Sequence, residues 1–210
     1  MILAIIGTHE INGLNEGMTM INNEYSIERI IRLARDNGIE KVICMLDSGR
    51  NKLREFLSSE NFGIPVKVLA NYSISTLQSL FIMAPLLKDS PFCLTSPESF
   101  LPEDDFAEFI GYSLIHTEID GAVAVTNQRD HNHTLSVAMN QENTIIKFSD
   151  THEGYYWGTA GICSLNPGIF EELKLPHGTK AGKFGNYLRL LLDKGYILKG
   201  FSVSQGNCGS

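Results

Sequence analysis

Short apolar segments alternate with amphipathic segments over the first half of the chain. The apolar segments have the length and composition of strands that are buried on both faces. They are Ile2–Ile6, Lys41–Leu46, Val66–Leu69 and Phe92–Thr95. The segments between them have helical periodicity, and the predicted helices are Ser26–Asn37, Arg50–Ser58, Thr76–Leu87 and one that begins at Leu101–Asp105. Strands and helices in this alternation form right-handed crossovers, so the pattern predicts a mostly parallel α/β sheet.

The ends of the predicted helices carry specific signals. Ser26 is a residue type that caps helix N-termini, and Asn37-Gly38 is a typical stop. Pro85 is expected in the last turn of its helix or at a kink. Pro102 and the three acids after it suit a first helical turn, because carboxylates are stabilised at the positive end of the helix dipole.

The second half of the chain has a different pattern. Three strands separated by polar turns predict an antiparallel meander over Gly121–Thr126, Leu135–Met139 and Thr144–Phe148. The remaining predicted elements are a strand over Gly158–Leu165, helices over Pro167–Leu173 and Gly185–Lys194, and a last strand over Tyr196–Val203. No long linker or repeat divides the sequence, so we expect a single domain over residues 1–210.

Composition and charge exclude several classes of protein. The 210 residues are 43% hydrophobic and 20% charged, which is enough for a core and argues against disorder. With a net charge of −7, the chain lacks the excess of positive charge that attracts nucleic acid or an anionic membrane. No apolar run approaches the roughly 18 residues of a membrane span, and the N-terminal segment lacks the basic region of a signal peptide. We therefore expect a soluble, cytoplasmic protein that binds neither nucleic acid nor membrane.

The four cysteines fit that compartment. Cys44, Cys93 and Cys163 lie within apolar segments, Cys208 lies near the end of the chain, and no C-x-x-C pair occurs. Free, buried thiols are therefore favoured over a disulfide or zinc framework.

Candidate chemistry is expected after the strands, because ligands of open α/β sheets bind outside the carboxyl ends of the strands. The segment Gly7–Gly13 follows the first strand and has a glycine at each end. Its backbone N–H groups are able to surround a phosphate, and an ordinary polar loop is the alternative. Glu98 follows the fourth strand, where its carboxylate suits a hard divalent cation, and a solvated surface acid is the alternative.

Two other segments have polar or small residues that suit a site. The residues Trp157–Gly161 let a ligand approach the backbone closely, whereas a β-bulge packed on a neighbouring helix explains the same residues equally well. Lys147, at the end of the predicted meander, is the cation expected to face the same cleft. His131 and His133 have a metal-ligand spacing, but they lie in a polar turn, so a solvated turn is favoured.

Six segments together have an order that is typical of one family. They are Leu3–Gly7, Ile21–Ile31, Asp36–Ile43, Ser75–Leu80, Pro91–Thr95 with Glu98, and Thr159–Ile162. In this order, over nearly the whole chain, they resemble the sugar-phosphate nucleotidyltransferases (NDP-sugar pyrophosphorylases). The resemblance implies the three-layer αβα nucleotide-diphospho-sugar transferase fold, which is Rossmann-like with a mostly parallel mixed sheet. It also implies a nucleotide-binding half over residues 1–100 and a sugar-binding half over residues 101–210.

The family joins a sugar 1-phosphate to the α-phosphate of a nucleoside triphosphate, releases pyrophosphate and uses Mg²⁺. The resemblance therefore implies catalytic roles for Glu98 and Lys147, and Mg²⁺ ligands at Glu98 and Asn207. The implied nucleotide-binding residues are Gly7, Thr8, His9, Glu10, Asn12, Gly13, Ser75, Thr76 and Gln78. The implied sugar-binding residues are Trp157, Thr159, Ala160 and Gly161.

The sequence also departs from the family pattern at four places. Asn12 stands where the family has an Arg, and a following Pro-Lys pair is missing between Gly17 and Met18. Glu98 stands for an Asp, and Asn207 for a second metal-binding acid. A hydrogen bond to a charged group contributes about 1.5–3 kcal/mol. The loss of two cations and one metal ligand therefore predicts a rate lower by on the order of 10⁴.

Three hypotheses follow from the matches and the departures. The first is a nucleotidyltransferase with an altered site. The second is a catalytically inactive pseudoenzyme that binds a nucleotide, a sugar nucleotide or a protein partner. The third is a glycosyltransferase of related fold, which the short second half disfavours. Apolar residues around Phe81–Leu87 would also allow a dimer.

Overall fold

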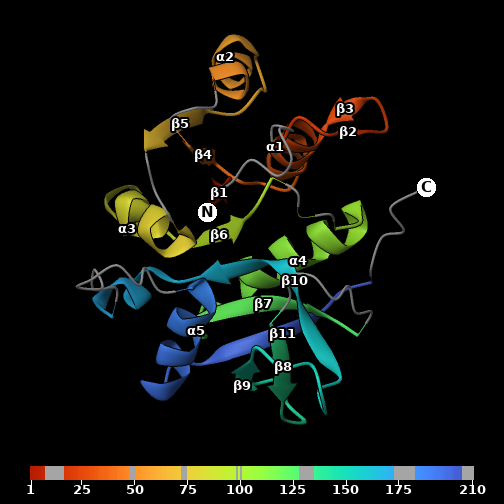
Figure 1. The fold of residues 1–210 in the computed structure, drawn as a ribbon, viewed down its shortest axis with the longest axis vertical. Coiled ribbons are helices and arrows are strands. Elements are labelled where there is room, and N and C mark those ends of the chain that lie inside the picture. Colours follow the sequence, from red (N-terminus) through yellow and green to blue (C-terminus); the bar gives the residue numbers. More distant parts are fainter. Residues whose placement is uncertain are drawn as a thin grey trace.

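The computed structural model describes residues 1–7, 17–47, 51–71, 75–97, 99, 101–127, 135–172 and 183–204. The strands are β1 (Ile2–Ile6), β2 (Met20–Ile21), β3 (Glu24–Tyr25), β4 (Lys41–Asp47), β5 (Val66–Asn71), β6 (Phe92–Thr95), β7 (Gly121–Thr126), β8 (Ser136–Met139), β9 (Ile145–Ser149), β10 (Trp157–Leu165) and β11 (Leu198–Ser202). All but β2 and β3 form one sheet in the order β11-β7-β10-β6-β1-β4-β5, with β8 attached to β10 and β9 attached to β8 (Figure 1).

Helices cover both faces of this sheet. On one face lie α1 (Ser26–Asp36), α2 (Asn51–Ser59) and α4 (Glu103–Ile115), and on the other lie α3 (Thr76–Leu87) and α5 (Phe184–Asp193) (Figure 1). Each face has its own cluster of buried apolar side chains. In β1, Leu3 and Ile5 belong to the first cluster, and Ile2, Ala4 and Ile6 to the second. This double burial explains why the strand sequence is apolar throughout, and it confirms the predicted three-layer α/β fold.

Most of the pairing in the sheet is parallel, as predicted. β1 pairs in parallel with β4 and β6, β4 with β5, and β11 with β7. The exception in the centre is β10, which runs antiparallel between β6 and β7. Because β10 runs in the opposite direction, its first residues lie at the edge where its parallel neighbours end.

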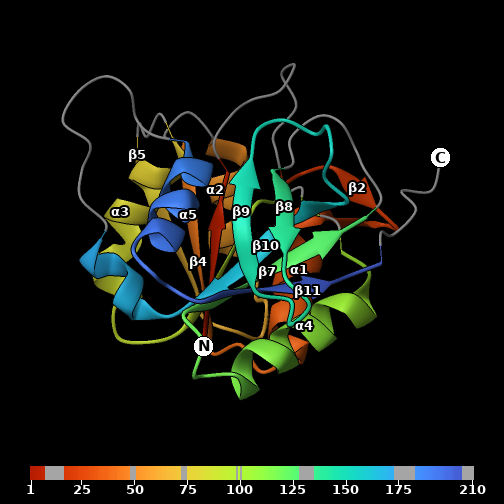
Figure 2. The same ribbon diagram turned by 90° about the horizontal axis from the view of Figure 1, so that it is seen from below.

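The predicted antiparallel meander is correct for β8 and β9 and wrong for β7. β7 pairs with β10 and β11, while β8 pairs with β9 and with the first residues of β10. Of the three predicted strands, β8 and β9 form a hairpin, which lies in front of β10 and β7 in Figure 2. The polar turns correctly predicted where the three strands end. The partner of β7, however, is the later strand β10, and the local sequence pattern contains no signal for that pairing.

Several helix ends differ from the prediction by one or two residues. Tyr25, and not Ser26, occupies the N-cap of α1, and its amide N–H donates to the Glu28 carboxylate at 3.4 Å. The Ser26 hydroxyl is buried and has no hydrogen-bond partner among the described residues. Pro85 lies in the last turn of α3, as expected, and Pro102 lies immediately before α4. The helix predicted over Pro167–Leu173 is a short 3-10 helix, η1 (Pro167–Glu171).

The cysteine prediction is confirmed for the three described residues. Cys44, Cys93 and Cys163 are buried free thiols, and burial raises the pKa of the Cys44 and Cys163 thiols to about 12. Cys208 lies outside the described residues. In the part of the chain that the structure describes, no helix has both the length and the apolar composition that a membrane span requires.

Candidate functional site at the carboxyl edge of the sheet

The carboxyl ends of β1, β4 and β6 meet at one edge of the sheet, here called the carboxyl edge. Gly7 follows β1, Ser96 follows β6, and β10 enters the sheet from the same edge. The strand order reverses between β1 and β6, because β4 and β5 lie on one side of β1 whereas β6, β10 and β7 lie on the other. Ligands of open α/β sheets bind at such a reversal. The candidate site is therefore the carboxyl edge between β1, β6 and the first residues of β10.

Two described glycines, Gly7 and Gly17, flank the first loop (residues 8–16) and lie at this edge. The Gly7 amide donates to the Met45 carbonyl at 3.1 Å, which holds the end of β1 beside β4. Gly17 has a left-handed φ of +88°, and its carbonyl accepts from the Ile27 amide at 3.1 Å. A Cβ on Gly17 would lie 3.2 Å from Pro97 Cβ, so Gly17 lies against the segment that follows β6. The predicted phosphate-binding residues Thr8, His9, Glu10, Asn12 and Gly13 lie outside the described residues.

Hydroxyl groups join the end of β6 to β10. Thr95 Oγ1 lies 3.1 Å and Ser99 Oγ lies 2.9 Å from the Gly161 carbonyl oxygen, and both donate to it. Ser96 Oγ lies 3.0 Å from Ser99 Oγ. These residues were not predicted as site residues, although three hydroxyl side chains within the five residues Thr95–Ser99, at the end of a buried strand, were a usable signal. Glu98 lies within this segment but outside the described residues.

The predicted sugar-binding residues start β10. Between Thr159 and Cys163 the register against β7 shifts, so this part of β10 contains a β-bulge. Gly161 lies in the bulge, has a φ of +82° and is exposed. Thr159 exchanges hydrogen bonds with Leu135: its amide donates to the Leu135 carbonyl at 2.9 Å, and its Oγ1 accepts from the Leu135 amide at 3.2 Å. A bulge was one of the two expected explanations of this segment, and a ligand role for Gly161 stays a prediction.

Three of the predicted nucleotide-binding residues, Ser75, Thr76 and Gln78, lie at the start of α3. Ser75 is the N-cap of this helix, and its Oγ accepts from the Gln78 amide at 3.2 Å. Thr76 is the first residue of the helix. Because α3 follows β5, this N-terminus lies on the side of the carboxyl edge that belongs to β5. Ser75 therefore has a structural role as a helix cap, and its contact with a base stays a prediction.

Lys147 lies on the outer hairpin and not on β6 or β10. It is exposed on β9, opposite Ala138 of β8. Its Nζ lies 5.8 Å from the centre of the Tyr155 ring. A hydrogen bond from the Lys147 ammonium, with a second from Ser149, lowers the pKa of the Tyr155 phenol. A contact between Lys147 and a substrate phosphate stays a prediction.

The residues considered as metal ligands lie outside the part of the chain that the structure describes. These are Glu98 and Asn207, which were predicted as Mg²⁺ ligands, and His131 and His133, for which a solvated turn was favoured. Within the described ranges, no group of three or more His, Cys, Asp or Glu side chains is placed to hold a metal ion.

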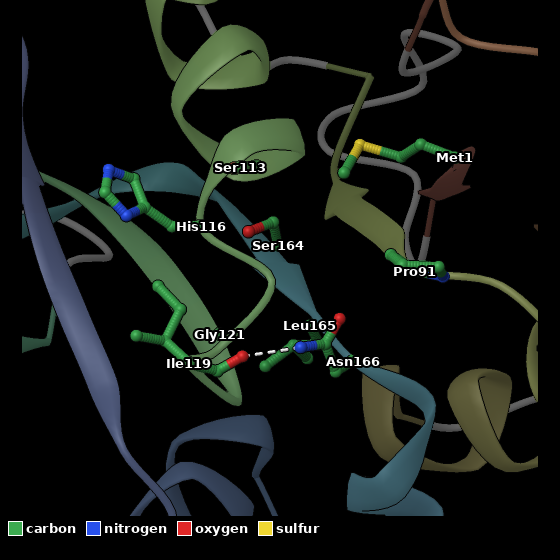
Figure 3. A pocket seen from close by; sticks show the side chains of 9 residues that line it. All are labelled: Met1, Pro91, Ser113, His116, Ile119, Gly121, Ser164, Leu165 and Asn166. Carbon is green, nitrogen blue, oxygen red and sulfur yellow. Dashed lines mark hydrogen bonds between the residues drawn. The ribbon is translucent and has the colours of Figure 1, made fainter.

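A small cavity lies at the opposite, amino edge of the sheet (Figure 3). Residues from strand starts line it, among them Met1, Pro91 and Gly121. In Figure 3 the Asn166 side chain donates to the Ile119 carbonyl beside it. The cavity volume is about 10 Å³, which is room for about one water molecule. This cavity is too small for a nucleotide, and it is distant from the segments that converge at the carboxyl edge.

Neither a protein-family model nor a curated protein sequence matches this chain. Solved structures resemble it over nearly its whole length. The inositol-1-phosphate CTP transferase from T. maritima has a TM-score of 0.81 at 16% identity, covering 96% of this chain and 84% of that one. CMP:2-keto-3-deoxy-manno-octonic acid synthetase, complexed with CTP, has a TM-score of 0.73 at 14% identity, covering 100% and 91%. A protein assigned as a glucose-1-phosphate thymidylyltransferase from Bacillus anthracis, complexed with a sucrose, has a TM-score of 0.80 at 12% identity, covering 97% and 86%.

The fold is that of the nucleotide-diphospho-sugar transferases. By their names, the three similar proteins are nucleotidyltransferases. At 12–16% identity the likeness establishes a shared transferase fold, and the binding residues of those proteins do not transfer to this chain position by position.

Proposed function

We propose that this protein is a sugar-phosphate nucleotidyltransferase, which transfers a nucleotidyl group from a nucleoside triphosphate to a sugar 1-phosphate and releases pyrophosphate. The observation that supports this most is the convergence of three segments at the carboxyl edge. These are the two described ends of the first loop, at Gly7 and Gly17, the hydroxyl residues Ser96 and Ser99, and the exposed bulge at Gly161. Of the proteins that share the fold, one is named a CTP transferase, one a thymidylyltransferase and one a synthetase, which is complexed with CTP.

In this proposal the protein positions two substrates, the nucleoside triphosphate and the sugar 1-phosphate, and forms no covalent bond with either. An oxygen of the sugar 1-phosphate attacks the α-phosphorus of the triphosphate, and the bond between that phosphorus and the pyrophosphate oxygen breaks. Backbone N–H groups of the first loop would hold the triphosphate, and the bulge at Gly161 would receive the sugar. Positioning and charge neutralisation provide most of the rate in such a transfer.

Magnesium is the proposed cofactor, with Glu98 and Asn207 as its ligands. When bound, it would neutralise charge on the phosphate oxygens. The described hydroxyls of Thr95 and Ser99 at the edge are neutral, so they do not replace a carboxylate in neutralising the charge of the metal ion. In this proposal Glu98 supplies the negative charge from this segment.

The second candidate function is nucleotide or sugar-nucleotide binding without turnover. The departures in the first loop and at Asn207 favour it, since they remove two cations and one metal-binding acid from the family pattern. Both candidates use the same edge of the sheet. They differ in whether binding requires Mg²⁺ and in whether pyrophosphate is released.

A thermal-shift titration tests binding first. The ligands are ATP, GTP, CTP, UTP and dTTP and the corresponding sugar nucleotides, each with and without Mg²⁺. A ligand at 100 times its dissociation constant stabilises the fold by about 2.7 kcal/mol, which raises the melting temperature of a chain of this size by roughly 5–10 °C. A Mg²⁺-dependent shift with one triphosphate supports the transferase. Binding that is equally strong with and without Mg²⁺, without turnover, supports the second candidate. If no ligand changes the melting temperature, nucleotide binding is refuted.

A pyrophosphate-release assay then tests the chemistry. The bound triphosphate is combined with glucose 1-phosphate or inositol 1-phosphate, and Glu98→Ala is expected to abolish release. Glu108→Ala is the matched control, because Glu108 is an exposed acid on α4. Glu98→Asp restores the acid that the family pattern has and should retain or raise the rate. If Glu98→Ala released pyrophosphate as fast as Glu108→Ala, the proposed role of Glu98 would be wrong.

A further inference from the structure

Ser99 is the centre of the hydroxyl network between β6 and β10. Its Oγ donates to the Gly161 carbonyl at 2.9 Å. A serine hydroxyl has one proton, so Ser96 Oγ, at 3.0 Å, has to donate its own proton to Ser99 Oγ. Ser99 thus links β10 to the residues that follow β6, across 62 positions of sequence.

The contact between Ser99 and Gly161 is also sterically close. A Cβ built on Gly161 would lie 2.6 Å from Ser99 Oγ and 3.2 Å from Ser99 Cβ. The bulge of β10 therefore fits against the segment after β6 only because residue 161 has no side chain. A shift of the bulge along β6 would displace Ser99, and a shift of Ser99 would release the bulge.

The other side of this segment is held by different elements. The Arg29 guanidinium is buried, and its Nη2 donates to the Leu101 carbonyl at 2.7 Å. Pro97 is held by the close approach of Gly17. The segment between β6 and α4 is therefore fixed to α1 and to the first loop on one side, while Ser99 fixes it to β10 on the other.

We propose that Ser99 is a positioning residue, which holds the sugar-side bulge of β10 in register with the segment that carries Glu98. The proposal rests on the proposed function, because it concerns two ligands bound at the same edge. Without the Ser99 hydroxyl, the Gly161 carbonyl keeps its hydrogen bond from Thr95 Oγ1 at 3.1 Å but loses its link to the residues after β6, so the bulge is less constrained relative to the triphosphate side. The affinity for a sugar 1-phosphate should then fall when the nucleotide is bound, while the affinity for the nucleotide alone should change little.

The test is isothermal titration calorimetry on the full chain. The nucleotide probe is the α,β-methylene analogue of the triphosphate selected by the thermal-shift panel, with Mg²⁺, so that no turnover occurs. Glucose 1-phosphate and inositol 1-phosphate are titrated with and without this analogue. Coupling between two ligands commonly changes affinity by about 5- to 150-fold. We expect Ser99→Ala to raise the sugar 1-phosphate Kd at least about fivefold with the analogue present and less than about twofold without it.

Two further variants separate positioning from general stability. Ser99→Thr retains the hydroxyl and should restore the coupling. Ser113→Ala removes a buried hydroxyl that bonds within α4, to the Phe109 carbonyl at 2.9 Å, and should leave the coupling unchanged. Hydrogen exchange in the absence of ligand should be faster at residues 158–162 in Ser99→Ala and unchanged there in Ser113→Ala.

The possible failures are distinguishable. If the unaltered protein binds neither ligand, the proposed function fails and the role of Ser99 fails with it. If the unaltered protein binds both ligands, and Ser99→Ala leaves the coupling unchanged or weakens the sugar phosphate equally with and without the nucleotide, only the role of Ser99 is wrong.

Discussion

Replacing Gly161 by alanine tests whether close contact, and not backbone conformation alone, requires a glycine in the bulge of β10. Gly161 has a φ of +82°. A left-handed conformation costs an L-residue with a side chain about 1–2 kcal/mol, and the reduced freedom of the unfolded chain offsets about 0.4–1 kcal/mol of that. The second cost is steric, because the new Cβ would lie 2.6 Å from Ser99 Oγ.

Gly38 provides the matched control. It has nearly the same φ, +79°, and a Cβ there would have no other atom within 4 Å. Gly38→Ala should therefore show the conformational cost alone, about 0–1.6 kcal/mol after the offset. Gly161→Ala should show the same cost together with the loss of the 2.9 Å hydrogen bond from Ser99, which contributes about 0.5–1.5 kcal/mol. We expect a total of about 0.5–3 kcal/mol for Gly161→Ala, and a larger cost than for Gly38→Ala.

Urea denaturation of both variants measures the difference. A double-mutant cycle with Ser99→Ala tests its cause, because this change removes the atom at 2.6 Å and leaves only the Ser99 Cβ at 3.2 Å. The cost of Gly161→Ala should fall by about 1 kcal/mol in that background. If Gly161→Ala were no more destabilising than Gly38→Ala within about 0.5 kcal/mol, or if the cycle showed no coupling, the steric argument would be wrong.

Three further predictions concern single charges. The hydrogen bond from Arg32 holds the pKa of the Glu103 carboxyl below its usual 4.5. The Arg32–Glu103 interaction therefore stabilises the fold fully above pH 4.5, and this stabilisation is lost as the pH falls through the lowered pKa. Below about pH 5, the stability of Glu103→Gln, measured from melting curves, should depend less on pH than the stability of the unaltered protein. The difference should be less than about 1 kcal/mol, because the ion pair is exposed. An equal pH dependence of the two proteins would contradict the prediction. Lys147→Met should raise the pKa of the Tyr155 phenol, because it removes a hydrogen bond that lowers this pKa. The pKa is measured by ultraviolet titration, and Tyr155→Phe assigns the signal. An unchanged titration would mean that the two groups do not interact in solution. Asn12→Arg restores a cation of the family pattern and should raise triphosphate affinity about tenfold or more, whereas unchanged affinity would place the phosphates elsewhere.

The fold could be predicted from the sequence because strand burial leaves a local signal. In β1, successive residues such as Ile2 and Leu3 face different core clusters, so the whole strand is apolar and is recognisable without knowledge of its neighbours. Strand order has no such signal. The pairing of β7 with β10 depends on residues about 40 positions apart in sequence, such as Val123 opposite Cys163, and the predicted place of β7 in the meander was therefore wrong.

The site could be predicted in part for the same reason. A glycine directly after β1 and small residues at the start of β10 are local signals, and both segments lie at the carboxyl edge. The role of Ser99 was missed, because its hydrogen bond reaches a residue 62 positions away and serines after strands are common. The Ser26 cap was wrong by a single residue, since Tyr25 occupies the N-cap and the Ser26 side chain is buried.

The distribution of charge explains why dependence on Mg²⁺ separates the two candidate functions. The chain has a net charge of −7, and its first Lys or Arg is Arg29. Arg29 and Arg32, on α1, are both engaged, the first with the Leu101 carbonyl and the second with Glu24 and Glu103. A triphosphate in the first loop would therefore meet backbone donors within an acidic protein, and a metal ion would have to neutralise it for transfer. A nucleotide that binds equally well without Mg²⁺ must be held mainly through its base or sugar, which is how a binding protein, and not a transferase, would recognise it.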